Sequence, residues 1–141
     1  MAEPAVIVDT GPLVAFVVKD DERHTWVVER FKQLPAPFKT CEAVLTEAFF
    51  LVARLPQGVR RYCELIESGL VVTAFDLLAE RAAVAELVRK YASVPMALAD
   101  ACLVRMFEKD PRSTIFTLDG HFRIYRTRGR RRLPCIMPED A

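Results

Sequence analysis

Short β-type runs alternate along the chain with longer stretches in which apolar residues recur at helical spacing. The runs that predict strands are residues 5–8, 38–40, 70–73, 113–117 and 133–136. The stretches that predict helices are residues 13–18, 22–34, a segment from Thr40 or Glu42 to Pro56, and residues 58–68, 77–92 and 96–109. Strands separated by helices favour right-handed crossovers, and hence an α/β fold with a largely parallel sheet covered by helices on both faces.

The first apolar run ends in an acid. Val6, Ile7 and Val8 are consecutive and β-branched, which is typical of a strand buried on both faces, and Asp9 follows directly. Because ligands bind at the carboxyl ends of strands in open α/β sheets, Asp9 stands where chemistry takes place. Thr10 or Gly11 suits the cap of the next helix, and Pro12 suits its first turn. The alternative interpretation is that Asp9 is only a turn or capping residue.

Three further acids lie in apolar surroundings. Glu47 and Asp100 each lie in an apolar helical stretch, with no lysine or arginine within one helical turn. Asp119 follows the run 113–117, just as Asp9 follows the first strand. A desolvated carboxylate without a partner is costly or has a raised pKa, so each of these positions needs an explanation. The alternative for Glu47 and Asp100 is a hydrogen-bonded buried acid or a polar helix face.

A shared metal ion would explain all four acids. If the strands 5–8 and 113–117 are neighbours, Asp9 and Asp119 emerge side by side, and helices carrying Glu47 and Asp100 reach the same edge. Several carboxylates in one place repel each other, and a divalent cation relieves that repulsion. Oxygen ligands favour Mg²⁺ or Mn²⁺, while two histidines and no close Cys/His pair argue against zinc. Such a site activates water for attack on a phosphodiester.

The order of these acids resembles the PIN-domain family, in particular the small VapC-type toxins of toxin-antitoxin pairs. The motifs that carry the resemblance are 8–12, Thr46-Glu47 with the apolar run after it, 98–101 and 117–122, so it covers nearly the whole chain. It implies a three-layer α/β/α fold with a central, mainly parallel sheet. It also implies a Mg²⁺-dependent endoribonuclease that dimerises and is silenced by a cognate antitoxin. By resemblance the metal-binding acids are Asp9, Glu47, Asp100 and Asp119, with Thr117 assisting near the water or phosphate. His121 stands where many relatives have a further acid, so the sequence does not support a complete second metal site.

Composition limits the class of protein. The 141 residues, 52% hydrophobic, fit one domain spanning residues 1–141, and a net charge of +1 excludes a strongly basic or acidic protein. Four widely spaced cysteines without a CxxC pair indicate a reducing compartment. No apolar run approaches the length of a membrane span and no export signal is visible, so we expect a cytoplasmic protein.

One local charge run stands out. Residues 123–132 hold six arginines and no acid. We expect the RNA-binding side chains Arg126, Arg128, Arg130, Arg131 and Arg132 here, with Tyr125 available for base stacking. A solvated loop is the simpler explanation for at least half of these arginines. His24 is expected on the surface, and His121 is not needed as a base. Trp26, Phe31, Phe49 and Phe50 suit the core, a dimer interface or an apolar groove for an antitoxin helix.

Three functions from different classes fit the pattern. The first is the metal-dependent ribonuclease, either a toxin or an RNA-processing nuclease outside a toxin-antitoxin system. The second is a catalytically silent module that binds RNA or an antitoxin through the arginine run, which predicts RNA binding without Mg²⁺-dependent cleavage. The third is a phosphoacceptor receiver domain, which is disfavoured because Asp9-Thr10 is not the acidic pair expected after a first strand.

Overall fold

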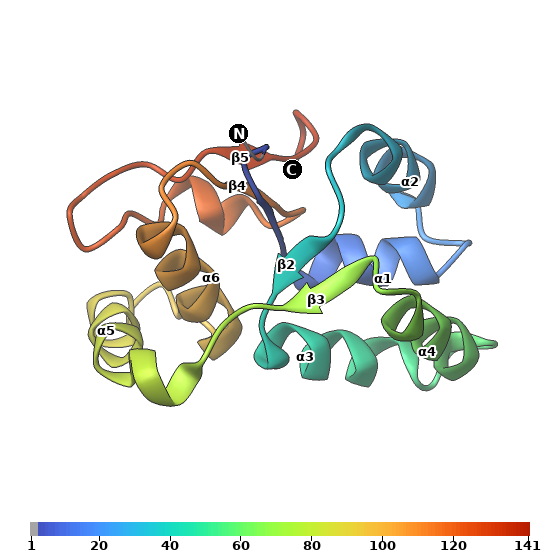
Figure 1. The fold of residues 1–141 in the computed structure, drawn as a ribbon, viewed down its shortest axis with the longest axis horizontal. Helices are drawn as coiled ribbons and strands as arrows, with labels where there is room; N and C mark the ends of the chain where they lie inside the picture. The colour runs from blue at the N-terminus through green and yellow to red at the C-terminus, as the bar shows by residue number, and fades with distance from the viewer. Residues whose placement is uncertain (1–2) are drawn as a thin grey trace.

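The computed structural model describes residues 3–141, whose centre is a five-stranded parallel sheet (Figure 1). The strands are β1 (Val6–Val8), β2 (Phe38–Thr40), β3 (Val71–Thr73), β4 (Thr114–Phe116) and β5 (Cys135–Ile136). Their order across the sheet is β3-β2-β1-β4-β5, and every pair is parallel. The predicted strands are all present; β2 has the predicted bounds, and the other four are one or two residues shorter.

Six α-helices connect and cover the strands. They are α1 (Thr10–Val17), α2 (His24–Gln33), α3 (Glu42–Val52), α4 (Gly58–Ser68), α5 (Leu77–Lys90) and α6 (Leu98–Lys109). In Figure 1, α5 and α6 lie to one side of the sheet and α1, α2 and α4 to the other. The helix α3 contacts both groups, since it packs against α1, α4 and α6. This arrangement confirms the predicted α/β/α fold with a parallel sheet.

The helix starts differ from the sequence expectation in one respect that bears on the site. Asp9, rather than Thr10 or Gly11, is the N-cap of α1, and its side chain accepts a hydrogen bond from the Thr10 N–H. The helix α2 follows Arg23, which makes no side-chain cap hydrogen bond. A short 3₁₀ helix, η1 (Gly120–Arg123), was not predicted; it begins directly after Asp119, whose side chain caps it.

The core lies between the sheet and the two helical layers. Phe31 packs edge-on against Phe38 and lies near Phe116, and all three rings are buried. Trp26 packs against Phe116 from the partly buried face of α2. In contrast, Phe49 and Phe50 on α3 are exposed, so the core interpretation of these two residues is wrong.

All four cysteines are free thiols. Within residues 3–141, none of the helices has both the length and the apolar character that a membrane span requires.

Candidate metal centre

The site lies where the order of the strands reverses. The chain passes from β1 outward to β2 and β3, and later fills the other side of β1 with β4 and β5. β1 and β4 are therefore direct neighbours, with Val8 paired to Phe116 and the Asp9 N–H donating to the Phe116 carbonyl at 2.9 Å. Ligands in open α/β sheets collect at such a reversal. The juxtaposition of Asp9 and Asp119 predicted from the sequence depends on this pairing.

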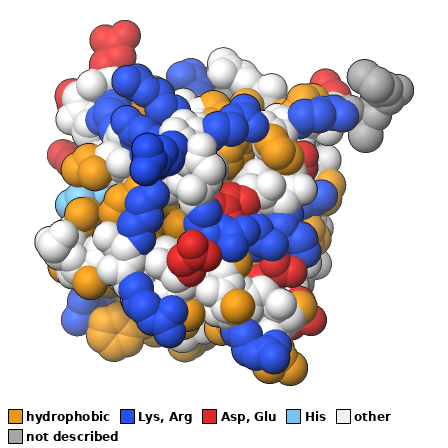
Figure 2. Space-filling model, turned by 90° about the vertical axis from the view of Figure 1, so that its left-hand side faces the viewer, with side chains coloured by type: hydrophobic (Ala, Val, Ile, Leu, Met, Phe, Trp, Pro, Cys, Tyr) orange, Lys and Arg blue, Asp and Glu red, His pale blue; other side chains and the backbone are white. Residues whose placement is uncertain are grey.

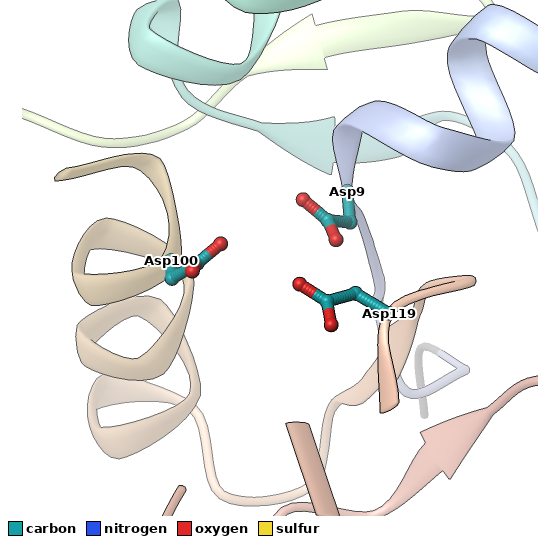
Figure 3. Close-up of side chains that lie close together, drawn as sticks. All are labelled: Asp9, Asp100 and Asp119. Atoms are coloured by element: carbon teal, nitrogen blue, oxygen red, sulfur yellow. The ribbon is translucent and has the colours of Figure 1, made fainter. Parts of the chain in front are cut away.

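Three carboxylates meet at this edge. Asp9 follows β1, Asp119 follows β4, and Asp100 lies in the first turn of α6; Figure 3 shows the three side chains pointing toward one another. One carboxylate oxygen from each lies within 4.8 Å of the others. Three segments that are far apart in the sequence therefore deliver one cluster of oxygen ligands.

Asp9 is the most buried member of the cluster. Its side chain has two roles, since Oδ1 accepts the Thr10 N–H at 2.7 Å and caps α1, while Oδ2 accepts the Thr117 hydroxyl at 2.7 Å. Burial raises the pKa of Asp9 from 3.8 to about 7, the two hydrogen bonds oppose this, and the charges of Asp100 and Asp119 add to it. Asp9 therefore caps α1, as the alternative interpretation expected, and also belongs to the cluster of carboxylates.

Thr117 links the two acids at the strand ends. Its buried hydroxyl donates to Asp9 and accepts the backbone N–H of Asp119 at 3.0 Å. Gly11 permits the close packing of α1 against Leu118, because a Cβ at position 11 would lie 3.2 Å from the Leu118 side chain. The Thr117 hydroxyl thus orients the Asp9 carboxylate and the backbone at the start of the following turn, and it is buried from solvent.

Asp100 is held by two donors on one oxygen. Oδ2 accepts the Ala97 N–H at 3.2 Å and the Tyr125 hydroxyl at 3.0 Å. Burial raises the pKa of Asp100, and the charge of Asp119 raises it further, while these hydrogen bonds lower it. Burial and the proximity of Asp100 also raise the pKa of Tyr125, which keeps its hydroxyl protonated as a donor.

Asp119 forms the open side of the cluster. Its Oδ1 accepts the His121 N–H at 2.9 Å and lies 2.8 Å from the His121 Nδ1. The side chains of Asp119 and His121 are 39% and 53% exposed, so this side of the cluster is open to solvent. His121 also stacks over the Tyr125 ring at a centroid distance of 6.4 Å.

Glu47 lies outside the group of three. It is exposed on α3, which agrees with the alternative of a polar helix face and not with a carboxylate buried among apolar neighbours. Partial burial nevertheless raises its pKa, and the charges of Asp100 and Asp119 raise it further.

The free oxygens suit a hard divalent cation. Within residues 3–141, Asp100 uses only Oδ2 and Asp119 only Oδ1 in hydrogen bonds, which leaves the second oxygen of each for a ligand. Among the same residues, no lysine or arginine forms an ion pair with any of the three aspartates. A partly buried, uncompensated set of carboxylate oxygens fits Mg²⁺ or Mn²⁺.

The arginine run 123–132 follows Asp119 in the sequence, but two of its arginines form contacts away from the cluster of carboxylates. Arg128 pairs with Glu108 at 2.9 Å and Glu86 at 3.2 Å. Glu108 lies eight residues after Asp100 on α6, about 12 Å along the helix axis. The Arg126 guanidinium donates to three backbone carbonyls of its own loop. Because these contacts occupy Arg126 and Arg128, we leave both out of the proposed RNA-binding set.

Other members of the run remain at the surface. Arg130 and Arg132 are exposed, and the exposed Arg131 guanidinium lies over the Phe107 ring at 5.4 Å. Figure 2 shows the face that carries α5, where Lys and Arg side chains spread widely with Asp and Glu side chains between them. The expectation that Tyr125 stacks on RNA bases is wrong, because this residue is 1% exposed and its hydroxyl binds Asp100.

The contact of Tyr125 with Asp100 was not predicted from the sequence. An aromatic residue inside an arginine run carries no local signal for contact with an acid 25 positions earlier. His24 is partly buried at the start of α2, where its Nδ1 contacts the Ala15 carbonyl at 2.7 Å, and it has no part in the cluster.

Comparison with known proteins supports the architecture. No protein-family profile and no curated protein sequence matches this chain. Among solved structures the fold is similar to VapC20 of Mycobacterium tuberculosis, described as a toxin that cleaves the sarcin-ricin loop, with a TM-score of 0.71 and 19% sequence identity. The similarity covers 82% of this chain and 91% of the VapC20 chain. This chain therefore has the PIN-domain fold of the VapC-type toxins, as the sequence resemblance predicted.

Proposed function

We propose that this chain is a Mg²⁺- or Mn²⁺-dependent endoribonuclease that serves as the toxin of a toxin-antitoxin pair. The observation that carries the proposal is the cluster of Asp9, Asp100 and Asp119, with oxygens within 4.8 Å of one another at the carboxyl edge of the sheet. The fold similarity to VapC20, a toxin that cleaves the sarcin-ricin loop, supports RNA as the substrate.

The residues have distinct proposed roles. Asp9, Asp100 and Asp119 hold the cation, and Thr117 orients Asp9 through its 2.7 Å hydrogen bond. A bound Mg²⁺ or Mn²⁺ supplies Lewis-acid stabilisation of phosphate charge and activation of the attacking water. We retain Glu47 as a further proposed ligand, because the charges of Asp100 and Asp119 contribute to its raised pKa.

RNA approaches from the exposed side of Asp119 and His121 in this proposal. Arg130, Arg131 and Arg132 are the proposed phosphate contacts, because they are exposed and have no ion pair within residues 3–141. Phosphate contacts of this kind bind without regard to sequence and weaken with added salt.

The proposed protein partners are a cognate antitoxin and a second copy of the chain. An apolar groove of about 980 Å³ runs between α2 and α4, lined by Phe16, Val28 and Leu65 and bordered by Lys19 and Arg61. Such a groove suits an amphipathic antitoxin helix with acidic flanks. The exposed rings of Phe49 and Phe50 support a homodimer, because large apolar side chains at the surface often mark an interface.

Cleavage of defined RNAs tests the function. The purified chain is incubated with an RNA containing the sarcin-ricin loop and with an unstructured RNA, in Mg²⁺, in Mn²⁺ and in EDTA. We expect cleavage that requires the metal and is lost in Asp119→Asn, while the exposed Asp20→Asn variant stays active. RNA binding without cleavage under all conditions would favour the catalytically silent module instead.

A further inference from the structure

The loop after η1 places an aromatic side chain behind the metal centre. Tyr125 is 1% exposed, and its ring packs edge-on against Tyr91 and Phe122 with centroid distances of 5.2 Å. Its hydroxyl donates to the Asp100 Oδ2 at 3.0 Å. Packing against both rings restricts the movement of the Tyr125 ring, and with it the direction of this hydrogen bond.

The carboxylate of Asp100 needs such a constraint. The terminal torsion of an aspartate is soft and samples a broad range of angles. The only other donor to Asp100 within residues 3–141 is the Ala97 N–H, at the longer distance of 3.2 Å. Both donors use Oδ2, and Figure 3 shows one oxygen of Asp100 directed toward Asp9 and Asp119.

We propose that Tyr125 is a positioning residue of the metal centre, whose hydroxyl fixes the Asp100 carboxylate with its Oδ1 available to the cation. The inference rests on the proposed function, since it concerns the same site. It assigns the arginine-rich loop a second task besides RNA binding, which is to carry the support for a metal ligand. Groups that orient metal ligands in this way typically contribute 10- to 100-fold to metal affinity or activity.

A neighbouring tyrosine provides a matched control. Tyr91 belongs to the same aromatic cluster and is also buried, but its hydroxyl accepts the Arg126 N–H at 2.7 Å and has no bond to Asp100. Tyr125→Phe and Tyr91→Phe therefore remove the same atom from the same cluster. Only the first removes a donor from the metal centre.

The test measures Mn²⁺ binding to the full chain by electron paramagnetic resonance, without RNA. We expect Tyr125→Phe to weaken Mn²⁺ binding about 10- to 100-fold and Tyr91→Phe to leave it within about threefold. Equal effects of the two substitutions, or native affinity in Tyr125→Phe, would overturn the inference while leaving the proposed function intact. A native chain that binds no Mn²⁺ would overturn both.

A double-mutant cycle separates positioning from general destabilisation. In an Asp100→Ala background Tyr125 has no carboxylate to orient, so adding Tyr125→Phe should cause no further loss of Mn²⁺ affinity. An additive loss would show that Tyr125 acts by another route and would overturn the inference. In the cleavage assay, we expect saturating Mn²⁺ to restore the kcat of Tyr125→Phe, with the KM for RNA unchanged.

Discussion

Replacing Asp9 with asparagine should stabilise the metal-free protein at neutral pH. The carboxylate of Asp9 is buried, and its pKa is raised from 3.8 to about 7 by burial and then by the neighbouring acids. The folded protein therefore binds the Asp9 proton more tightly than the unfolded chain does. The contribution of this group to stability is complete below pH 3.8 and is lost as the pH rises toward 7.

The magnitude follows from the two pKa values. The interval between 3.8 and about 7, at about 1.4 kcal/mol for each pH unit, corresponds to about 4 kcal/mol lost by pH 8. Asparagine carries no charge and retains an oxygen for the Thr10 N–H, but it alters the bond with Thr117, which costs about 1 kcal/mol. We therefore expect Asp9→Asn to raise the free energy of unfolding by about 2 to 4 kcal/mol at pH 8.

Urea unfolding in EDTA at pH 8 and pH 5 measures this effect. The advantage of the variant should shrink by about 2 to 3 kcal/mol between these two pH values. Added Mn²⁺ should stabilise the native protein through binding to the folded state, and the variant much less. The exposed Asp20→Asn variant serves as the control. If Asp9→Asn is no more stable than the native protein at pH 8, the three carboxylates are not under the electrostatic strain that their burial implies.

Three further predictions test the surroundings of the site. Thr117→Val should lower the free energy of unfolding by about 1 to 3 kcal/mol and weaken Mn²⁺ binding, because Asp9 and the Asp119 N–H lose a buried partner. Thr117→Ser keeps the hydroxyl and should retain native stability in urea unfolding and native affinity in Mn²⁺ titration. Glu108→Ala should lower the free energy of unfolding, measured in urea, by about 1 to 3 kcal/mol, because this buried carboxylate pairs with Arg105 and Arg128. Glu86 is exposed and pairs only with Arg128 among the described residues, so Glu86→Ala should change the free energy of unfolding by less than about 0.5 kcal/mol. Replacing Arg130, Arg131 and Arg132 with alanine should weaken RNA binding and reduce the slope of log affinity against log salt concentration by about 0.7 for each phosphate that is no longer neutralised. An unchanged slope in filter-binding assays would contradict the assignment of these arginines as phosphate contacts.

Local pattern was sufficient to predict the strands and the α-helices of this fold. Strand runs such as Val6–Val8 and helices such as Gly58–Ser68 are specified by the spacing of apolar residues and by Gly and Pro at their ends. The candidate acids also carry a local signal, because a carboxylate among apolar neighbours or directly after a buried strand is unfavourable in free energy unless a hydrogen-bond partner or a cation stabilises its charge. Asp9, Asp100 and Asp119 could therefore be proposed before the fold was known.

Only the tertiary structure decided which of these residues meet. Glu47 and Asp100 have similar apolar neighbours in the sequence, yet Asp100 lies in the first turn of a helix that contacts β1 and β4, whereas Glu47 lies in the second turn of α3 and is exposed. The hydrogen bond of Tyr125 to Asp100 and the ion pairs of Arg128 depend on where the loop after η1 packs against α5 and α6. The physical reason is that local composition determines the preference of each segment, while contacts between distant segments depend on the order in which the strands pair.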